Sequence, residues 1–322
     1  MRFKLTWDRG LVLLLIATFV VGSRVSPEFI GADNVTFVLQ DVTEILLIAL
    51  AMAFLIITGE IDLSVASTLT LASDVIGVVV HSGHSMWLAV AAGLATGVLA
   101  GAFNGFLVTV IGLPSLAVTI GTMALYRGLC WVLLGNTPIS DIPDSWTNLG
   151  LDTIPHTVFP WSFILVIVFG TIAVYTLHLT RFGRWTYAIG INAQAARFSG
   201  IRVERVKFLL FVATGFMSAV AGLVYTLRFA SSSPDGAMGY ELSVIAACLF
   251  GGIAVAGGAG TMWGVLAAVI ELGAIRSLLQ LSDFSANALQ VVSGGLLLAS
   301  VTFPQLAALA RRRRTRLAAI RG

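Results

Sequence analysis

Long apolar segments with almost no charge are the feature that most constrains this chain. Of its 322 residues, 57% are hydrophobic and only 11% are charged, and the mean hydropathy is +0.95. A soluble domain carries about 25% charged residues. Helices can cross the hydrocarbon core of a bilayer because they satisfy their backbone polar groups internally. The sequence therefore predicts an all-α polytopic membrane protein.

The alternation of apolar and polar segments predicts about ten transmembrane helices, some of them broken or short. The chain is interpreted as a single membrane-embedded domain over residues 1–322. The first apolar segment is interpreted as a retained span, with a cleaved signal peptide as the alternative. The expected spans are Leu11–Gly22, Ile45–Thr58, Val65–Val80, Met86–Gly112, Ser115–Leu134, Trp161–Leu179, Val206–Phe229, Leu242–Val255, Met262–Leu279 and Ala286–Phe303.

Basic residues gather in three places, and this fixes the expected orientation. Three cations lie near the N-terminus, six in an internal loop at about 181–207 and six in the tail 311–322. Short loops rich in Lys and Arg remain in the cytoplasm. We therefore expect the internal loop and both termini to be cytoplasmic, and the basicity to reflect topology rather than binding of nucleic acid. The segment 135–159 has no cation and is expected outside, as is the turn Ser231–Gly236. An external loop is also expected at the acids Glu28, Asp33, Asp41 and Glu44.

The internal basic loop contains a predicted short helix from Asn192 to Ser199. Asn192 is a suitable N-cap, an alanine-rich turn follows it, and Gly200 can end the helix. Small residues give this helix a low surface that another protein can approach closely. From the residues alone, two interpretations remain: a solvated connector, or a docking element for a cytoplasmic partner.

A break in the apolar pattern at TGEIDLS, residues 58–64, carries two carboxylates, Glu60 and Asp62. A charge at membrane depth costs roughly 2.5–3.5 kcal/mol on insertion scales, so it normally faces a cavity or a partner. The two acids lie two residues apart, so a helix would direct them to different sides. The break is interpreted either as an interfacial turn or as a broken helix that lines a translocation route.

A glycine-rich segment, Cys248–Gly264, permits a further helix break or close helix packing. The chain has no GxxxxGK[ST] motif, so any ATPase that drives it must be another chain. The four histidines form no ligand pattern, no metal site is expected, and no enzyme motif such as GxSxG or HExxH is present. Cys130 and Cys248 lie in apolar segments and are expected to be core residues.

Four further charges lie inside apolar segments: Asp74, Arg127, Glu271 and Arg276. Pairing between helices is the favoured interpretation. Proton-coupled carriers also place acids inside the membrane. These charges alone therefore do not decide between modes of energy coupling.

Three segments together resemble one family. They are ITGEIDLSVAS from Ile57, the stretch Gly101–Gly128, and the internal loop running through VATGFMSAVAGLV into the glycine-rich segment. They are similar to the inner-membrane permease subunits of ribose-type monosaccharide ABC importers, which include rhamnose and autoinducer-2 permeases. Glu60 and Ala66 stand where that family usually has glycine, so substrate preference does not carry over with the resemblance.

The resemblance implies a multi-pass subunit of the bacterial cytoplasmic (inner) membrane. It works in the lipid bilayer with a second permease subunit, identical or related, with two cytoplasmic ATP-binding subunits and with a periplasmic sugar-binding protein. This chain is expected to bind no cofactor, since ATP and Mg belong to the partner ATPases. A monosaccharide or similar small polyol is the implied substrate, and the sequence does not name it.

The same resemblance assigns site residues by position. The ATPase-coupling element falls on Asn192, Ala195, Ala196, Ser199 and Gly200. The translocation path falls on or near Glu60, Ile61, Asp62, Leu63, Ser64, Asn104, Ser115 and Thr119. From charge and topology, Arg24 and Arg228 are expected to meet acidic residues of the binding protein. The alternative is a stand-alone ion- or proton-coupled secondary carrier that uses Glu60, Asp62, Asp74 or Glu271.

Overall fold

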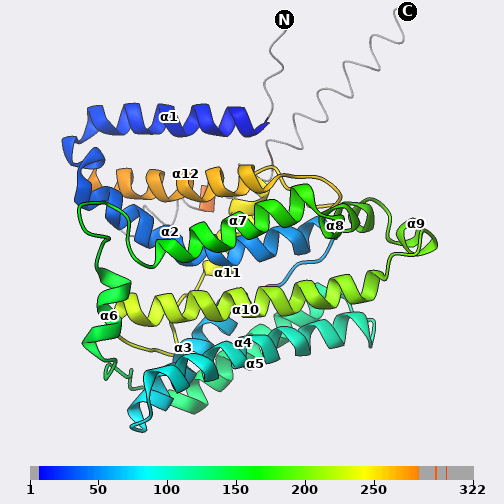
Figure 1. Ribbon diagram of the computed structural model, residues 1–322, viewed down its shortest axis with the longest axis horizontal. Helices are drawn as coiled ribbons and strands as arrows, with labels where there is room; N and C mark the ends of the chain where they lie inside the picture. Colours follow the sequence, from blue (N-terminus) through cyan, green and yellow to red (C-terminus); the bar gives the residue numbers. More distant parts are fainter. Residues whose placement is uncertain (1–6, 283–293, 296–301, 303–322) are drawn as a thin grey trace, which may run out of the picture.

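The computed structural model describes residues 7–282, 294–295 and 302, and the regular elements in this part of the chain are helices (Figure 1). The predicted last span, 286–303, lies outside the described residues apart from 294–295 and 302, and the basic tail 311–322 lies wholly outside them. The elements are α1 (Trp7–Val25), the 3-10 helix η1 (Pro27–Ile30), α2 (Ala32–Ile57), α3 (Val65–His81), α4 (Met86–Thr109), α5 (Ser115–Leu134), α6 (Asp144–Leu151), α7 (Phe163–Leu179), α8 (Arg181–Ile191), α9 (Ala193–Phe198), α10 (Val203–Phe229), α11 (Tyr240–Phe250) and α12 (Met262–Leu281).

Five of the described helices, α2, α4, α5, α10 and α12, are long and apolar enough to cross a membrane. The pair α7 and α8, bent by 66° between them, passes the same test as a sixth span. Helices α3 and α11 are apolar but shorter. The all-α polytopic membrane fold is thus confirmed, whereas the count of ten spans and the cytoplasmic placement of both termini stay predictions.

Helix α2 begins much earlier than the sequence predicts. We expected a short span from Ile45 after an external acidic loop, but α2 starts at Ala32 and includes Asp33, Asp41 and Glu44. Its second half, from Leu46 to Ile57, is almost completely buried. The expectation was wrong because Asp41 and Glu44 pair with cations on other helices, which hydropathy along one segment cannot reveal. Helix α2 is a central helix and is apolar on all sides over its buried half.

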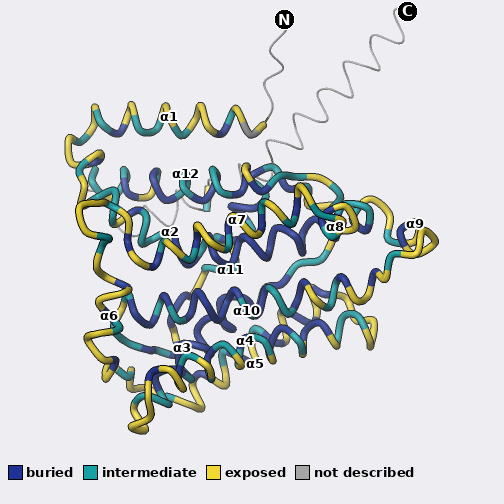
Figure 2. The backbone as a smooth tube through the Cα atoms, viewed as in Figure 1, coloured by how far each residue is buried: buried dark blue, intermediate teal, exposed yellow. Residues whose placement is uncertain are grey.

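The helices run roughly parallel in two groups (Figure 1). One group contains α1, α12, α2 and α7, and the other contains α10, α4, α3 and α5. The short helix α6 lies at one end of the molecule, and α8 and α9 lie at the opposite end. Figure 2 shows the buried residues along α2 and α10, between the groups, and exposed residues along α1 and on the outer sides of α4 and α5.

Glycines allow α4 and α10 to pack at very short range. A Cβ atom at Gly101 would lie 2.3 Å from the backbone oxygen of Phe211, and one at Gly215 would lie 2.2 Å from that of Gly97. Small residues let membrane helices approach closely, and van der Waals contact then holds them together. The outer sides of the second helix group stay apolar and exposed, as at Leu99 (68%) and Val132 (80%).

The chain between α10 and α12 is a broken span. Helix α11 has only 11 residues, which is too short to cross a bilayer. The predicted span Leu242–Val255 is therefore wrong at both boundaries, and the glycine-rich stretch that follows α11 forms turns. In the turn Ser231–Gly236, Ser232, Pro234 and Gly236 are buried, and its placement outside stays a prediction.

Candidate coupling and translocation site

The predicted short helix in the basic loop is present as α9, and it projects at one end of the molecule (Figure 1). The side chain of Asn192 caps it by accepting a hydrogen bond from the backbone N–H of Ala195 at 3.0 Å. The Ser199 hydroxyl donates to the backbone oxygen of Ala195 at 3.0 Å. Gly200 ends the element with a φ of 85°, which glycine adopts without strain.

The five residues predicted to couple α9 to a partner do not all face outward. Asn192, Ala195, Ser199 and Gly200 are exposed, whereas Ala196 is 4% exposed and packs inward. Asn192 and Ser199 use their side chains to hold the helix together.

The sequence analysis missed two large, exposed apolar side chains in and beside α9. Phe198 is 90% exposed and Ile191 is 75% exposed. The signal was available, because a phenylalanine in a basic, polar loop has no core to enter. We call Phe198, Ile191 and the exposed face of α9 the coupling surface.

The break between α2 and α3 gathers most of the predicted path residues into one polar network. Asp62, 1% exposed, accepts hydrogen bonds from the Ser64 backbone N–H at 2.9 Å, from the Ser64 hydroxyl at 2.6 Å and from the Thr214 hydroxyl at 3.2 Å. Asn104 donates its side-chain N–H to the Ser64 hydroxyl at 2.8 Å. The Tyr126 hydroxyl lies 3.3 Å from the Asn104 side-chain oxygen. Thr214 and Tyr126 were not predicted, because nothing local in the sequence relates them to the break.

Two other predicted residues hold the break from α5. The backbone N–H of Ile61 donates to the Ser115 hydroxyl at 3.5 Å, and the Thr119 hydroxyl donates to the Ile61 backbone oxygen at 3.4 Å. Ile61 and Leu63 are half-buried. The polar residues therefore fix the shape of the break, which lets non-helical backbone exist inside the protein.

Glu60 forms an ion pair with Lys207 on α10, and both side chains are largely buried, at 15% and 18% exposed. Lys207 lies in the second turn of α10, a few residues beyond α9. The extra carboxylate is thus neutralised by a cation that follows the coupling surface along the chain. Together with the bond from Thr214 to Asp62, this pair joins α10 to the break at two points.

The glycine-rich stretch before α12 contacts both the break and the basic loop. The backbone N–H of Gly258 donates to the Ile57 oxygen at 2.8 Å. A Cβ at Gly190, in α8, would lie 1.9 Å from that same oxygen. The Tyr187 hydroxyl donates to the Gly260 oxygen at 2.7 Å. The basic loop, the end of α2 and the stretch 251–261 therefore form one contiguous structure.

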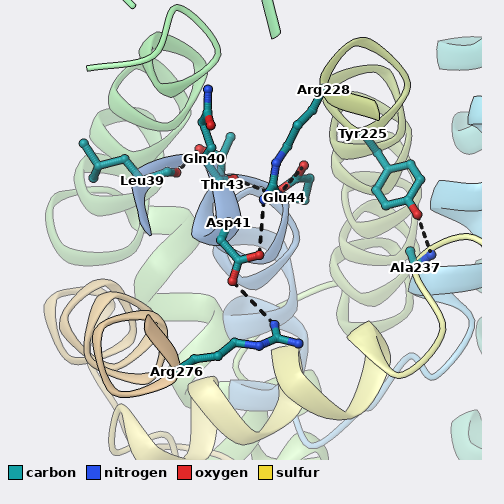
Figure 3. Close-up of polar contacts among 9 residues, drawn as sticks. All are labelled: Leu39, Gln40, Asp41, Thr43, Glu44, Tyr225, Arg228, Ala237 and Arg276. Atoms are coloured by element: carbon teal, nitrogen blue, oxygen red, sulfur yellow. Dashed lines mark hydrogen bonds and ion pairs between the residues drawn. The ribbon is translucent and has the colours of Figure 1, made fainter. Parts of the chain in front are cut away.

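At the other end of α10, Arg228 points into the protein (Figure 3). Its guanidinium lies 3.3 Å from Asp41 and 3.3 Å from Glu44, both on α2. Arg276 of α12 approaches Asp41 at 3.5 Å. The Arg228 side chain is only 10% exposed and Glu44 is fully buried, so the Arg228 charge is directed towards α2, and its docking role stays a prediction. We call these four residues the outer charge cluster.

The remaining predicted charges are placed as follows. Arg24, at the end of α1, is exposed, and its docking role stays a prediction. Arg276 pairs between helices, as favoured. Glu271 accepts a hydrogen bond from the Thr18 hydroxyl of α1 at 2.7 Å. Asp74 is buried, and neither of its carboxylate oxygens has a hydrogen-bond partner among the residues that the structure describes.

The structure combines apolar helices long enough to span a membrane, a polar break between α2 and α3, and a basic helical element at one end. This combination is that of a subunit of a membrane transporter. The chain belongs to the family described as "Branched-chain amino acid transport system / permease component", whose profile matches residues 34–301. This confirms the resemblance to transporter permeases that the three sequence segments indicate. It also supports a transport component rather than an enzyme.

Its relatives match along almost the whole chain. The L-arabinose transport system permease protein of Escherichia coli strain K12 is 34% identical over 96% of this chain and 94% of its own length. The ribose import permease protein of Bacillus subtilis strain 168 is 36% identical over 91% of each chain. An L-arabinose ABC transporter permease protein of Azospirillum brasilense is 32% identical over 92% of this chain and 87% of its own. No solved structure gives a significant match.

Proposed function

We propose that this chain is the transmembrane permease subunit of an ATP-binding-cassette importer that moves a monosaccharide or a similar small polyol. The relatives named for arabinose and ribose support a sugar, although the family description speaks of branched-chain amino acids. The observation that carries the proposal is the direct connection from α9 through α10 to the break. An exposed helix, α9, leads within a few residues into α10, which holds the polar break through Lys207 and Thr214.

The partners follow from this role. A cytoplasmic ATPase subunit docks on the coupling surface, where Phe198 enters an apolar pocket of the partner. A second permease subunit, identical or related, completes the path, and a periplasmic binding protein delivers the sugar. The complex resides in the bacterial inner membrane. ATP and Mg bind to the ATPase subunits, and this chain binds no cofactor.

The mechanism uses a rigid connection between the motor and the path. A neutral sugar has no charge to couple to the membrane potential, so uphill import needs a conformational drive. Closure of the ATPases displaces α9, and α10 transmits the displacement to the break through the Glu60–Lys207 pair and the Asp62 network. Both sites then bias two states of the same helix bundle.

A stand-alone carrier would need carboxylates that are free to bind a proton or an ion. Two of the four candidates, Glu60 and Asp62, are engaged by Lys207, Ser64 and Thr214. Their hydrogen bonds suit a structural and coupling role better than cyclic protonation.

Reconstitution tests the proposed function. The chain is inserted into liposomes with and without an ATP-binding subunit of a sugar importer from the same organism, and uptake of radiolabelled L-arabinose and D-ribose is measured in the presence of the loaded binding protein. We expect uptake only with the ATPase and ATP. Uptake driven by a proton or sodium gradient, with no ATPase present, would instead establish a secondary carrier.

A further inference from the structure

The segment between α10 and α11, residues 230–239, is anchored to the helix bundle through buried residues, although Asp235 and Met238 are exposed. The Ser232 hydroxyl donates to the backbone oxygen of Ser73 at 2.8 Å. The Thr70 hydroxyl donates to the Gly236 oxygen at 2.7 Å. Ala230 and Ala237 adopt left-handed conformations with φ of 49° and 52°, which non-glycine residues keep only where surrounding contacts enforce them.

Arg127 of α5 fixes the same segment from the other side. Its guanidinium donates to the backbone oxygens of Pro234 at 3.0 Å and Gly236 at 2.8 Å, and to the Thr70 hydroxyl at 3.1 Å. These two carbonyls flank Asp235. The Arg127 guanidinium therefore holds the backbone on both sides of Asp235, which is itself exposed.

The position of Ser73 and Thr70 along α3 gives the depth of the segment. The helix ends at His81, at the end of the molecule opposite α9 (Figure 1). Ser73 lies eight residues and Thr70 eleven residues before this end, or about 12 and 16 Å at 1.5 Å per residue. If the edge of the hydrocarbon core, which is about 30 Å thick, lies near the end of α3, the segment lies inside the membrane, in the half that the predicted orientation makes the outer one.

Asp235 is nevertheless exposed, while its neighbours Pro234 and Gly236 are buried. The Ser233 hydroxyl donates to the Asp235 carboxylate, and Ser233 is half-buried. Charged side chains and non-helical backbone at membrane depth do not face lipid, because both need water or protein partners. The surface that carries Asp235 and Ser233 therefore faces water or a partner subunit rather than lipid.

The chemistry of this surface suits a neutral polyhydroxylated molecule. Asp235 supplies acceptor oxygens, and Ser233 supplies a hydroxyl that donates or accepts. A sugar hydroxyl both donates and accepts hydrogen bonds, so it can pair with either side chain.

We propose that Asp235 and Ser233 line the translocation path in the outer half of the membrane, and that Asp235 accepts hydrogen bonds from substrate hydroxyls as they pass. Arg127 is a positioning residue that holds the 230–239 segment in place. The substrate class rests on the proposed function, whereas the aqueous exposure of Asp235 does not.

Thiol labelling tests the exposure directly, in the assembled transporter. Asp235→Cys and, separately, Ser233→Cys are made in a chain whose buried Cys130 and Cys248 are replaced by alanine, and a negatively charged, membrane-impermeant methanethiosulfonate is added from outside. We expect both positions to react. Val132→Cys, on the apolar outer side of α5, is the control that should not react, and Asp152→Cys in the external loop is the control that should.

Absence of labelling at both positions from either side would overturn the proposal and would place Asp235 against a second subunit. Labelling from the cytoplasmic side alone would overturn it as well. Because no sugar is needed, this outcome is independent of whether the transporter is driven by ATP, so the two proposals fail separately.

Uptake tests the contact with substrate. We expect Asp235→Asn to lower the maximal uptake rate for L-arabinose or D-ribose, whichever the wild type carries, about tenfold, which corresponds to about 1.4 kcal/mol. Binding of the ATPase should be unchanged. The matched control, Asp152→Asn, should transport normally. Equal, near-normal uptake by both variants would remove Asp235 from the path.

Discussion

The two ends of α10 are joined to α2 and its neighbours in contrasting ways. At the outer end, Arg228 lies among buried partners, with Asp41 and Glu44 on α2 and, through Asp41, a link to Arg276 on α12 (Figure 3). Towards the inner end, the ion pair of Lys207 with Glu60 and the hydrogen bond from Thr214 to Asp62 join α10 to the break. The difference suggests that α10 turns about a firm outer attachment while its inner end moves with the coupling surface.

The largest effect is expected at the outer charge cluster. Arg228→Met would leave the buried carboxylate of Glu44 without its cation. Breaking one side of a buried pair costs about 3–5 kcal/mol, so the protein should lose a large part of its thermal stability or fail to accumulate in the membrane. Thermal unfolding in detergent measures this, with the exposed Arg24→Met as control. Equal stability of the two variants would remove the cluster as the fixed end of α10.

The next effect concerns the coupling surface. Phe198→Ala should weaken ATPase binding by about 2 kcal/mol, or about 30-fold, because a buried aromatic at an interface contributes about this much. The fold of α9 should persist, since Phe198 is not part of the core. Pull-down of the ATPase with purified complex measures the loss. Leu209→Ala, exposed on α10, is the control. ATPase affinity unchanged in Phe198→Ala would exclude this residue from the interface.

A smaller effect is expected in the break. Asp62→Asn keeps the shape of the side chain but removes the charge that strengthens three hydrogen bonds. Hydrogen bonds to charged groups contribute about 1.5–3 kcal/mol, so uptake should fall on the order of tenfold with ATPase binding intact. Asp152→Asn serves as the matched control. If uptake is normal in both variants, Asp62 does not belong to the functional site.

The smallest effect is expected at the inner ion pair. Glu60→Gln and Lys207→Gln should each reduce the ratio of sugar moved to ATP hydrolysed by at least about fivefold, since even a solvent-exposed pair can contribute about 1 kcal/mol and this one is largely buried. The exchange Glu60→Lys with Lys207→Glu should restore part of the ratio. A double variant no better than the single ones would argue that the pair does not transmit motion.

Much of the fold was predictable because hydropathy and charge act locally. The helix capped by Asn192, the break at Glu60–Ser64 and the glycine break before α12 all depend on residues adjacent in sequence. The errors arose where distant residues meet. Asp41 and Glu44 enter a membrane helix only because Arg228, more than 180 residues away, neutralises them.

In the candidate site, too, the residues adjacent in sequence were predictable and the contacts between distant residues were not. Asp62 and Ser64 could be predicted from their place in the break, whereas Thr214 and Tyr126 could not, because their roles depend on how α10 and α5 pack against it. The anchored position of the 230–239 segment was also beyond sequence analysis. A polar run with serine, proline and glycine looks like a surface turn until Arg127 and Thr70 are seen to hold it.

Accessibility of the coupling surface tests the central claim most directly. Phe198→Cys, in the chain with Cys130 and Cys248 replaced by alanine, is treated with an impermeant thiol reagent in intact cells and in inside-out vesicles, with and without the ATPase. The account predicts reaction only in inside-out vesicles, and protection when the ATPase is bound. Reaction in intact cells, or no protection by the ATPase, would contradict it.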